Sequence, residues 1–379
     1  MMKSLNYLME EANLVLNRKE LIFKEIKNQN TLIVLMPGKN LYYLTGIDVM
    51  LSLERPFLYL VNVGENYTYL IASKLYEKEL DCSTFSKYYF YTDLENPFST
   101  LEKYIVGMGL VNKEIDMCVE KTLPCYIYNN LNSILKTKNI LYVDNIISKS
   151  RIIKNSDEET NILKAAFIVD ETFKKLCKET LKGKSEKDIA ALIDYIMRSL
   201  GARGSSFETI VAVSENAADP HHIPNDRVVK KGDSIVFDFG AIYNGYCSDI
   251  TRTVFVGEPN EEAQKIYNIV KEAQNNAINA VAKGSPIKNV DIAARSTIEK
   301  YGYGQYFIHR TGHGIGLDIH EEPYVTAENN NILVNGMVFT IEPGIYINKK
   351  IGIRIEDDIL VKGKANILTK STKELIIFN

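Results

Sequence analysis

Short apolar runs that resemble strands dominate the first 150 residues. Thr31–Met36 is rich in β-branched residues and is ended by Pro37-Gly38, which predicts a buried strand. Two further runs, Phe57–Val63 and Tyr67–Ala72, are separated by a short loop containing glycine and predict a β-hairpin. Helical stretches are mixed with these runs. We therefore expect a mixed α/β domain in this part of the chain.

The pattern changes near residue 150, where helices come first and strands follow. Ser156 and Glu159 have the spacing of a capping box, and the apolar residues after them recur at helical intervals. Ser185 begins a second helical pattern, which Gly201 ends. The remaining predicted elements are strands at about 208–213 and 234–240, helices at about 260–283 and 288–300, and strands from 337 onward. The order helix, helix, strands occurs twice, which indicates a duplicated unit.

The dipeptide Asn244-Gly245 is the strongest hairpin signal in this second region. Asn-Gly between apolar runs favours a type I′ turn, because both central residues of that turn need positive φ. With the turn at this point, Asp238 faces Thr251, and Asp249 lies one diagonal step away on the same face. Two carboxylates side by side repel each other unless a cation lies between them. The hairpin therefore predicts a metal site.

The apolar runs around Glu342 and Glu356 predict a second hairpin of the same kind. These two residues are an even number of positions apart, so a turn centred near Lys349 puts both carboxylates on one face. Glu342 also ends an apolar strand, just before Pro343, where an unpaired charge is costly. We therefore expect both glutamates to join the two aspartates around a cation.

His313 lies between the two hairpins, in a glycine-rich segment. Glycines at 312, 314 and 316 disfavour a continuous helix, so we expect a loop or a strand rather than a helical zinc motif. The five histidines of the chain fall into two clusters, one at 221–222 and one at 309, 313 and 320. Clustered histidines together with carboxylates in apolar strands indicate a metal centre.

Composition narrows the class of protein. The 379 residues carry 45 Lys+Arg and 48 Asp+Glu without a block of like charge, which argues against a nucleic-acid partner. The apolar runs are far shorter than the roughly 20 residues of a membrane span. Residues 1–20 lack the apolar core of a signal peptide. Five cysteines without a C-x-x-C pair indicate free thiols in a reducing compartment. We expect a soluble, cytoplasmic protein that has no membrane partner.

The candidate ligands resemble those of a known family. Five residues match, in their order along the chain and in their local sequence contexts, the five metal ligands of the pita-bread metallopeptidases: Asp238, Asp249, His313, Glu342 and Glu356. The segment Asn40–Gly46 resembles the amino-terminal domain of creatinase, prolidase and aminopeptidase P. This extra domain argues against methionine aminopeptidase, and the intact ligand set argues against creatinase, which uses no metal.

The resemblance implies a fold and a domain division. It implies an α+β fold, with a pita-bread (creatinase/aminopeptidase-like) catalytic domain at residues 151–379 that has two pseudo-symmetric halves. A smaller, mixed α/β domain of the creatinase type is expected to precede it at residues 1–150. A homodimer is expected by analogy with the family.

The resemblance also implies two divalent metal ions. Asp249 and Glu356 are expected to bridge them, with Asp238 on one ion and His313 with Glu342 on the other. The oxygen-rich ligand set suits Mn²⁺ as the first choice, with Co²⁺, Fe²⁺ or Zn²⁺ as alternatives. A hydroxide that bridges the ions is expected to attack the scissile carbonyl, with Glu342 as the catalytic proton shuttle.

In the proline-specific branch of this family, four further positions line the substrate pocket, and here they are His221, His309, His320 and Arg354. His221 or His320 is expected to be catalytic, because either imidazole could donate a hydrogen bond to the carbonyl oxygen of the scissile bond as it becomes an oxyanion. Arg354 could pair with a substrate carboxylate or orient Glu356. His222 is treated as a neighbour of His221, because the family pattern has one functional histidine there.

The expected substrate is a small peptide with proline at the second position, cleaved between the N-terminal residue and the proline. Both an Xaa-Pro dipeptidase (prolidase) and an aminopeptidase P fit the pattern. The residues Glu321-Glu322-Pro323 resemble small microbial prolidases and favour the dipeptidase. The alternative from another class is a non-catalytic pita-bread module that binds peptides or proteins.

Overall fold

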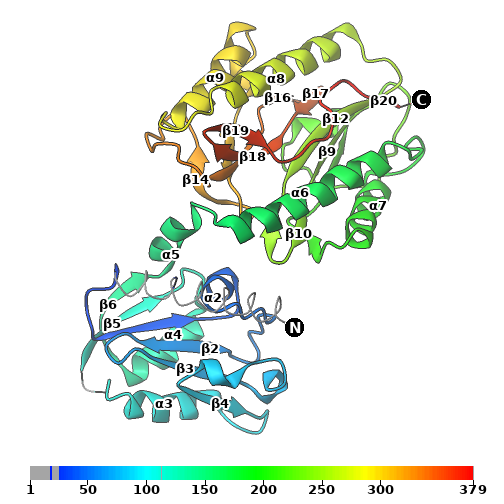
Figure 1. Cartoon of the computed structure of the whole chain (residues 1–379). Coiled ribbons are helices and arrows are strands. Elements are labelled where there is room, and N and C mark those ends of the chain that lie inside the picture. Colours follow the sequence, from blue (N-terminus) through cyan, green and yellow to red (C-terminus); the bar gives the residue numbers. More distant parts are fainter. Residues whose placement is uncertain (1–17, 19–24, 112, 379) are drawn as a thin grey trace, which may run out of the picture. The chain divides into compact units, whose positions relative to one another are not determined.

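The chain forms two compact units, Met1–Ser150 and Arg151–Asn379 (Figure 1). The computed structural model describes residue 18 and residues 25–111 and 113–378. The interpretation of residues 1–20 therefore lies outside the described part of the chain, apart from residue 18. Within the described ranges, the structure contains no helix that is both long enough and apolar enough to cross a membrane.

A six-stranded mixed sheet forms the centre of the first unit. In sheet order the strands are β4 (Lys87–Tyr91), β3 (Tyr67–Ser73), β2 (Leu58–Asn62), β1 (Thr31–Leu35), β5 (Glu114–Val119) and β6 (Lys136–Tyr142). The pairs β1–β2 and β2–β3 are antiparallel, and the others are parallel. The predicted strand is therefore β1, and the predicted hairpin is confirmed as β2–β3.

Helices complete the first unit. They are α2 (Lys39–Thr45), α3 (Pro97–Gly107), α4 (Cys125–Ile134) and α5 (Asp144–Arg151), with short 3₁₀ turns η1 (Lys74–Tyr76) and η2 (Cys82–Thr84). Leu101 of α3 and Leu131 of α4 belong to one buried cluster with apolar side chains of β1, β2 and β5. The two helices thus cover one face of the sheet. The mixed α/β character predicted for this part of the chain is confirmed.

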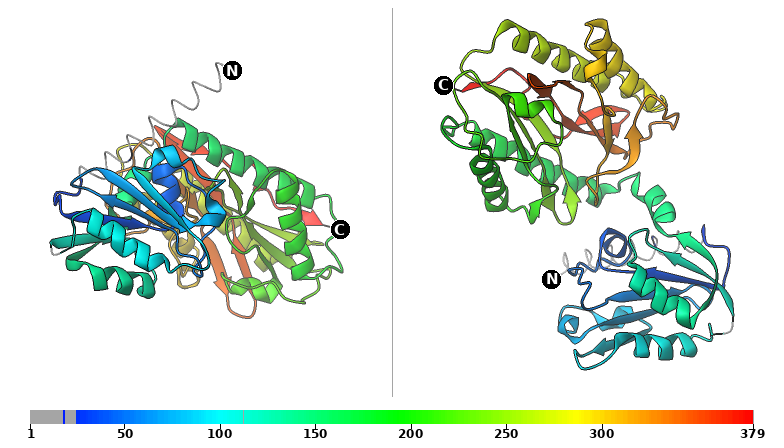
Figure 2. Two further views of the ribbon diagram at one scale, coloured as in Figure 1. Left: turned by 90° about the horizontal axis from the view of Figure 1, so that it is seen from below. Right: turned by 180° about the vertical axis from the view of Figure 1, so that it is seen from behind.

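In the second unit, two pairs of helices enclose the strands, as Figure 1 shows from one side and Figure 2 from two others. The helices are α6 (Ser156–Leu176), α7 (Glu186–Ser199), α8 (Glu261–Asn279) and α9 (Lys288–Lys300). The pair α6 and α7 packs on the strands of the first half, and the pair α8 and α9 on those of the second half. The predicted repetition of helices followed by strands is confirmed.

The strands of the first half form two sheets. One sheet has the order β20 (Ile377–Phe378), β12 (Ile250–Val256), β9 (Ser234–Phe239) and β8 (Ile210–Val213), and the other has the order β11 (Tyr246–Cys247), β10 (Ala241–Tyr243) and β7 (Gly204–Ser205). A 3₁₀ turn, η3 (Ser214–Ala218), follows β8. The chain therefore passes from one sheet to the other between β9 and β10, next to Asp238.

The strands of the second half also form two sheets. The larger has the order β14 (Glu321–Val325), β13 (Gly312–Gly314), β15 (Val338–Ile341), β18 (Asp357–Lys362) and β19 (Lys364–Ile367), and the smaller consists of β16 (Gly344–Ile347) and β17 (Ile351–Arg354). The 3₁₀ turn η4 (Gly304–Tyr306) precedes β13. The glycine-rich segment around His313 is thus extended, as predicted.

The start of α6 differs from the prediction by one residue. Its N-cap is Asn155, and the capping box is completed by Glu158. The predicted box of Ser156 and Glu159 is therefore wrong. Both pairs have the required spacing, and asparagine caps a helix as well as serine does, so the pattern alone does not choose between them. The predicted N-cap of α7, Ser185, is confirmed.

The Asn244-Gly245 hairpin forms as predicted. These two residues have φ values of 46° and 81°, and Asp238 pairs with Thr251 across β9 and β12. Gly240 lies where the hairpin crosses between sheets, and a Cβ there would be 2.0 Å from the Ser248 carbonyl oxygen. Only glycine fits this crossing, which brings the aspartate-bearing end of β9 into the interior.

The second hairpin is interrupted at the two glutamates. Ile341 pairs with Asp357 in β15–β18, and Gly344 pairs with Arg354 in β16–β17. The register is the same in both pairs, so Glu342 and Glu356 lie opposite each other at the break between the two sheets. The turn is centred on Lys349, which has a φ of 58°. The sequence predicted this turn position.

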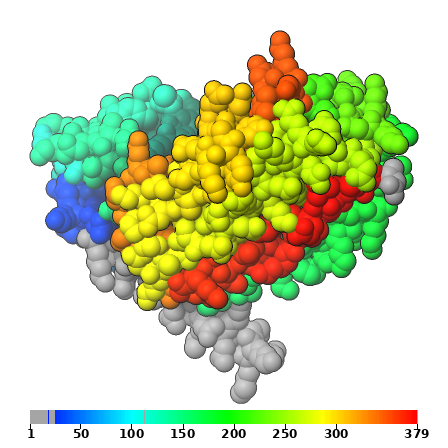
Figure 3. Space-filling model, turned by 90° about the horizontal axis from the view of Figure 1, so that it is seen from above, coloured from blue at the N-terminus to red at the C-terminus, as the bar shows by residue number. Residues whose placement is uncertain are grey.

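The C-terminal segment, red in Figure 3, runs along the surface of α8. The Tyr267 hydroxyl donates to the Lys373 carbonyl oxygen at 3.2 Å, and Lys271 pairs with Glu374 at 2.6 Å. Strand β20 then adds to β12 in the first half. The end of the chain thus joins the two halves of the second unit.

Candidate active site

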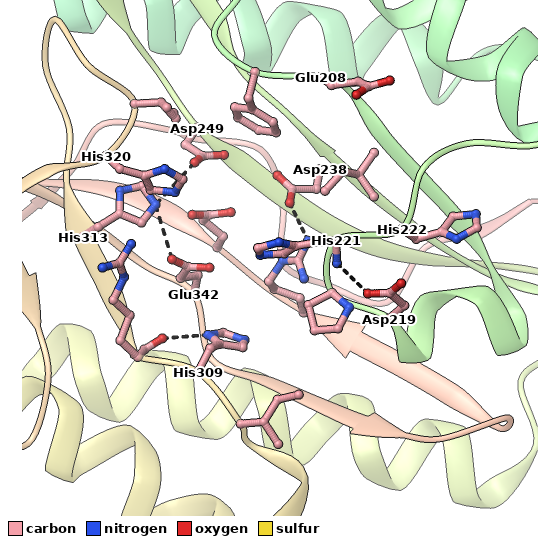
Figure 4. A pocket seen from close by; sticks show the side chains of 18 of the residues that line it. Glu208, Asp219, His221, His222, Asp238, Asp249, His309, His313, His320 and Glu342 are labelled. Atoms are coloured by element: carbon pink, nitrogen blue, oxygen red, sulfur yellow. Dashed lines mark hydrogen bonds and ion pairs between the residues drawn. The ribbon is translucent and has the colours of Figure 1, made fainter. Parts of the chain in front are cut away.

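One cavity of about 830 Å³ in the second unit contains the residues singled out in the sequence (Figure 4). All five histidines of the chain line it. The predicted metal ligands and Arg354 also line it, and they are Asp238, Asp249, His313, Glu342, Glu356 and Arg354. The structure therefore brings together segments that are more than a hundred residues apart.

The four carboxylates come from corresponding points of the two hairpins. Asp238 lies near the end of β9, and Asp249 immediately precedes β12. Glu342 follows β15, and Glu356 precedes β18. Each hairpin thus contributes two acids where its strands leave one sheet, and the crossing points of the two halves face a common centre.

His313 is held tightly between two strands. A Cβ on Gly312 would lie 1.8 Å from the Thr340 carbonyl oxygen, and one on Gly314 would lie 2.3 Å from the Glu322 carbonyl oxygen. The glycines on either side of the histidine therefore let β13 fit between β14 and β15. This close packing fixes the backbone that carries the imidazole.

The His313 ring presents an acceptor nitrogen to the carboxylates. Nδ1 lies 3.1 Å from the Gly314 carbonyl oxygen, to which it can only donate. In the neutral ring, Nε2 then carries the lone pair, and it lies 3.4 Å from Glu342 Oε1 and 3.8 Å from Asp249 Oδ2. Burial lowers the pKa of His313 to about 3, so the ring is neutral at neutral pH. This is the form of histidine that binds metals.

The pKa values of Asp249, Glu356 and Glu342 are raised. Burial and the neighbouring acids raise the pKa values of Asp249 and Glu356 well above the ordinary range. Burial also raises the pKa of Glu342 to about 7, although Arg354 opposes the shift. Buried acids at such close quarters are costly unless a cation compensates for them.

The arrangement fits a divalent metal. Single ligand atoms of Asp249, His313 and Glu356 all lie within 4.8 Å of one another, and all three residues are buried. In the described part of the chain, three buried carboxylate oxygens of the site have no hydrogen-bond partner, and they are Asp238 Oδ1, Asp249 Oδ1 and Glu356 Oε1. Unpartnered anionic oxygens beside an unprotonated imidazole nitrogen are the donors that such ions prefer.

The other carboxylate oxygens are held by protein groups, some of which the sequence did not reveal. Arg354 pairs with Asp238 Oδ2 and also donates to Tyr346 Oη at 2.8 Å and to Thr251 Oγ1 at 3.1 Å. Thr251 donates in turn to Glu356 Oε2 at 2.6 Å. In this structure Arg354 thus contacts the ligand set directly. Tyr346 carried no signal in the sequence, whereas Thr251 could have been found as the residue opposite Asp238.

His309 and His320 lie on the cavity wall in different environments. His309 Nδ1 is 2.7 Å from the Arg310 carbonyl oxygen, and Nε2 is 2.9 Å from Tyr346 Oη, so both ring nitrogens are occupied. Burial lowers the pKa of His309 to about 4. The His320 ring packs edge-on against the His313 ring, with their centroids 4.2 Å apart. Burial lowers the pKa of His320 as well.

The adjacent histidines 221 and 222 diverge. Figure 4 shows His221 close to the carboxylates, on the side away from His313 and His320, while His222 lies farther off. The His222 ring is 2.7 Å from Glu186 on α7. The structure therefore brings His221 into the central group and leaves His222 at its edge.

Two helix-and-sheet halves around a buried carboxylate-histidine centre define a pita-bread metallopeptidase domain. Residues 160–363 match the model of metallopeptidase family M24, and residues 25–153 match the creatinase/prolidase N-terminal domain. The chain belongs to metallopeptidase family M24.

Relatives with a named activity place the chain in the proline-specific branch of that family. An Xaa-Pro dipeptidase of Pyrococcus horikoshii is 36% identical over 96% of this chain and 99% of its own length. The crystal structure of a prolidase from Thermococcus sibiricus has a TM-score of 0.89 and 43% identity, and the match covers 96% of this chain and 98% of that one. An X-Pro aminopeptidase structure from Thermotoga maritima has a TM-score of 0.79 and 32% identity, covering 92% and 97%. The expected family and fold class are confirmed.

Proposed function

We propose that this protein is an Xaa-Pro dipeptidase, a metal-dependent hydrolase that separates an N-terminal residue from a C-terminal proline. The observation that carries the proposal is the convergence of four carboxylates and one imidazole in a cavity that Arg354 and the other histidines also line. Similarity to the Pyrococcus dipeptidase and the Thermococcus prolidase over nearly the whole chain supports a dipeptide substrate.

Five residues would hold two metal ions. Asp249 and Glu356 would be shared, Asp238 would belong to one ion, and His313 with Glu342 to the other. The unpartnered oxygens of Asp238, Asp249 and Glu356 support this assignment. When bound, the two cations supply Lewis-acid activation of the scissile carbonyl and of the attacking water. The carboxylate-rich set favours Mn²⁺, with Co²⁺, Fe²⁺ or Zn²⁺ as alternatives.

Glu342 moves the proton. In the metal-free chain burial raises its pKa to about 7, and its carboxyl group lies 3.4 Å from His313 Nε2, among the groups that surround the reacting peptide. It takes a proton from the attacking water and delivers it to the proline nitrogen as the carbon–nitrogen bond breaks. Thr340 donates a hydrogen bond to Glu342 Oε1 at 3.3 Å and orients the carboxylate.

His221 and His320 stabilise the negative charge that develops on the carbonyl oxygen. Burial lowers the pKa of His320, so its ring is neutral at neutral pH and carries one N–H that can donate to the oxyanion. His309 has both nitrogens occupied and therefore forms part of the pocket wall against which the substrate packs. Arg354 holds Asp238 and, through Thr251, Glu356.

The substrate class explains the need for such a site. A peptide bond before proline has no N–H, and the ring fixes the backbone angle of that residue. A peptidase that recognises the amide N–H therefore fails on this bond, whereas activation of the carbonyl does not depend on it.

The five cysteines are free in the structure, which supports the reducing, cytoplasmic location that the sequence suggests. The homodimer stays a prediction.

The test compares Ala-Pro, Ala-Pro-Ala and Ala-Ala as substrates of the chelated protein before and after addition of Mn²⁺. We expect metal-restored cleavage of Ala-Pro and little cleavage of the other two. Equal cleavage of Ala-Pro-Ala would make the protein an aminopeptidase P. A folded, metal-loaded protein that cleaves neither proline peptide would support the non-catalytic binding module instead.

A further inference from the structure

Glu186, the first residue of α7, has a buried carboxylate that several residues of one chain segment contact. Its side chain is fully buried and accepts hydrogen bonds on both oxygens. Oε1 accepts from the Val213 backbone N–H at 2.8 Å and from Asn216 Nδ2 at 2.9 Å. Oε2 accepts from the Asn225 backbone N–H at 3.0 Å and lies 2.7 Å from His222 Nε2. Residues 213–225, here called the histidine loop, thus wind around one carboxylate.

The histidine loop carries His221 into the cavity. Asp219 shapes the turn, because its side chain accepts from the His221 backbone N–H at 3.0 Å and its carbonyl oxygen accepts from the His222 backbone N–H at 3.2 Å. Side chains of these consecutive residues diverge, and Figure 4 shows His222 away from the carboxylates while His221 is beside them. One histidine faces the site, and the other binds Glu186.

The same loop is restrained from the opposite side by β17. A Cβ on Gly352 would lie 1.6 Å from the Ala217 carbonyl oxygen, so the backbone of η3 rests directly on this strand. Strand β17 ends at Arg354, which binds Asp238. The loop is therefore held between the N-terminus of α7 and a strand that contributes to the site.

We propose that Glu186 and His222 are positioning residues for His221. His222 acts as a donor to the buried carboxylate and thereby fixes the histidine loop, and it does not contact the substrate. Loss of that donor leaves Glu186 incompletely paired in the interior, which is costly and favours a shift of the loop. The proposal rests on the proposed function only in taking His221 as a group that contacts the reacting peptide.

Three variants test whether the contact between His222 and Glu186 positions the histidine loop. His222→Leu removes the donor, His222→Gln keeps an N–H at a similar reach, and Glu186→Gln changes the acceptor itself. The matched control is Asp226→Asn, which breaks the exposed pair between Asp226 and Lys187 of α7 beside the same loop. We expect kcat/KM on Ala-Pro to fall roughly tenfold to a hundredfold for His222→Leu, since small misplacements cost this much. His222→Gln should recover most of the loss, and the control should equal wild type.

Amide hydrogen exchange provides a readout that does not depend on activity. We expect faster exchange confined to residues 213–225 in His222→Leu and in Glu186→Gln, with metal content unchanged. Unchanged amide exchange of this segment in folded variants would overturn the proposal that His222 and Glu186 hold the histidine loop in place. If His222→Leu does not fold, Glu186→Gln and His222→Gln decide by the same measurement.

A double-mutant cycle separates positioning from general stability. His221→Ala combined with His222→Leu should be no slower than His221→Ala alone, because the loop then has nothing left to position. Losses that multiply would overturn the proposal. Absence of Ala-Pro cleavage by the wild type would overturn the proposed function instead, and the exchange experiment would still decide the role of Glu186 and His222.

Discussion

Arg354 and Asp238 form a buried ion pair that joins β17 of the second hairpin to β9 of the first. The pair leaves one oxygen of Asp238 free, and the same guanidinium also reaches Thr251, which binds Glu356. One cationic side chain thus orients a carboxylate from each hairpin.

Arg354→Lys should therefore weaken metal binding while the protein still folds. Lysine keeps the charge but lacks the planar fork that contacts three groups at once. We expect metal affinity to fall roughly tenfold to a hundredfold, as for other groups that orient metal ligands. Titration of the chelated protein with Mn²⁺ measures this, and an affinity equal to that of wild type would show that the arginine does not orient the ligands.

Gly312→Ala should displace His313. The added Cβ would lie 1.8 Å from the Thr340 carbonyl oxygen, so β13 must move away from β15. We expect loss of metal binding and a destabilisation of about 2–3 kcal/mol, typical of forced overpacking. Gly107→Ala, where a Cβ meets nothing within 4 Å, is the control and should leave both properties unchanged. Normal metal content in Gly312→Ala would contradict the tight fit of β13.

Lys154→Met should lower the free energy of unfolding, because it removes one partner from a buried ionic group beside the site. Lys154 and Arg151 both pair with Glu321, which follows His320 in the chain. Loss of one partner from a buried ion pair costs about 3 kcal/mol or more. Lys174→Met, which breaks an exposed pair with Glu171, should cost well under about 1 kcal/mol. Urea unfolding of both variants measures the difference, and equal losses would show that burial does not matter here.

In the metal-free protein, the contribution of Glu342 to stability should fall as the pH rises, whereas the buried His309 and His313, whose pKa values are lowered to about 4 and about 3, act in the opposite direction. The pKa of Glu342 is raised from 4.5 to about 7 in the folded chain, so between these values the unfolded carboxyl ionises while the folded one keeps its proton. For this carboxyl group the unfolded state binds fewer protons in this window, so its contribution to the free energy of unfolding falls as the pH rises through it.

Unfolding of chelated wild type and Glu342→Gln between pH 4 and pH 8 tests this sign. Glutamine cannot titrate, so the stability of the variant relative to wild type should increase across the window and level off above it. A constant difference would mean that folding does not raise the pKa of the Glu342 carboxyl group.

The sequence predicted the parts of the site that depend on local backbone rules. Asn244-Gly245 determines a turn, a turn determines a register, and the register places Asp238 opposite Thr251. The same reasoning located the turn at Lys349. The sequence also indicated the repeated order of helices and strands, because the helical apolar periodicity of the second unit is strong.

Contacts between distant segments could not be predicted in this way. Nothing in the local pattern shows that Tyr346 meets His309 and Arg354, or that Glu186 on α7 binds His222. Those contacts depend on how α7 and the two hairpins pack, which is a property of the tertiary structure. The error of one residue at the start of α6 has a local cause, because Asn155 and Ser156 are equivalent as caps.

Metal content and Ala-Pro cleavage, measured on the same samples, test the metal-dependent dipeptidase most directly. Chelated protein is titrated with Mn²⁺, and bound metal per chain and the cleavage rate are recorded together for wild type and for Asp249→Asn. If two ions bind at the carboxylate-histidine centre, cleavage should rise with occupancy up to two ions per chain, and the variant should lose both metal and activity. Cleavage by metal-free wild type, or full metal binding and activity in Asp249→Asn, would contradict it.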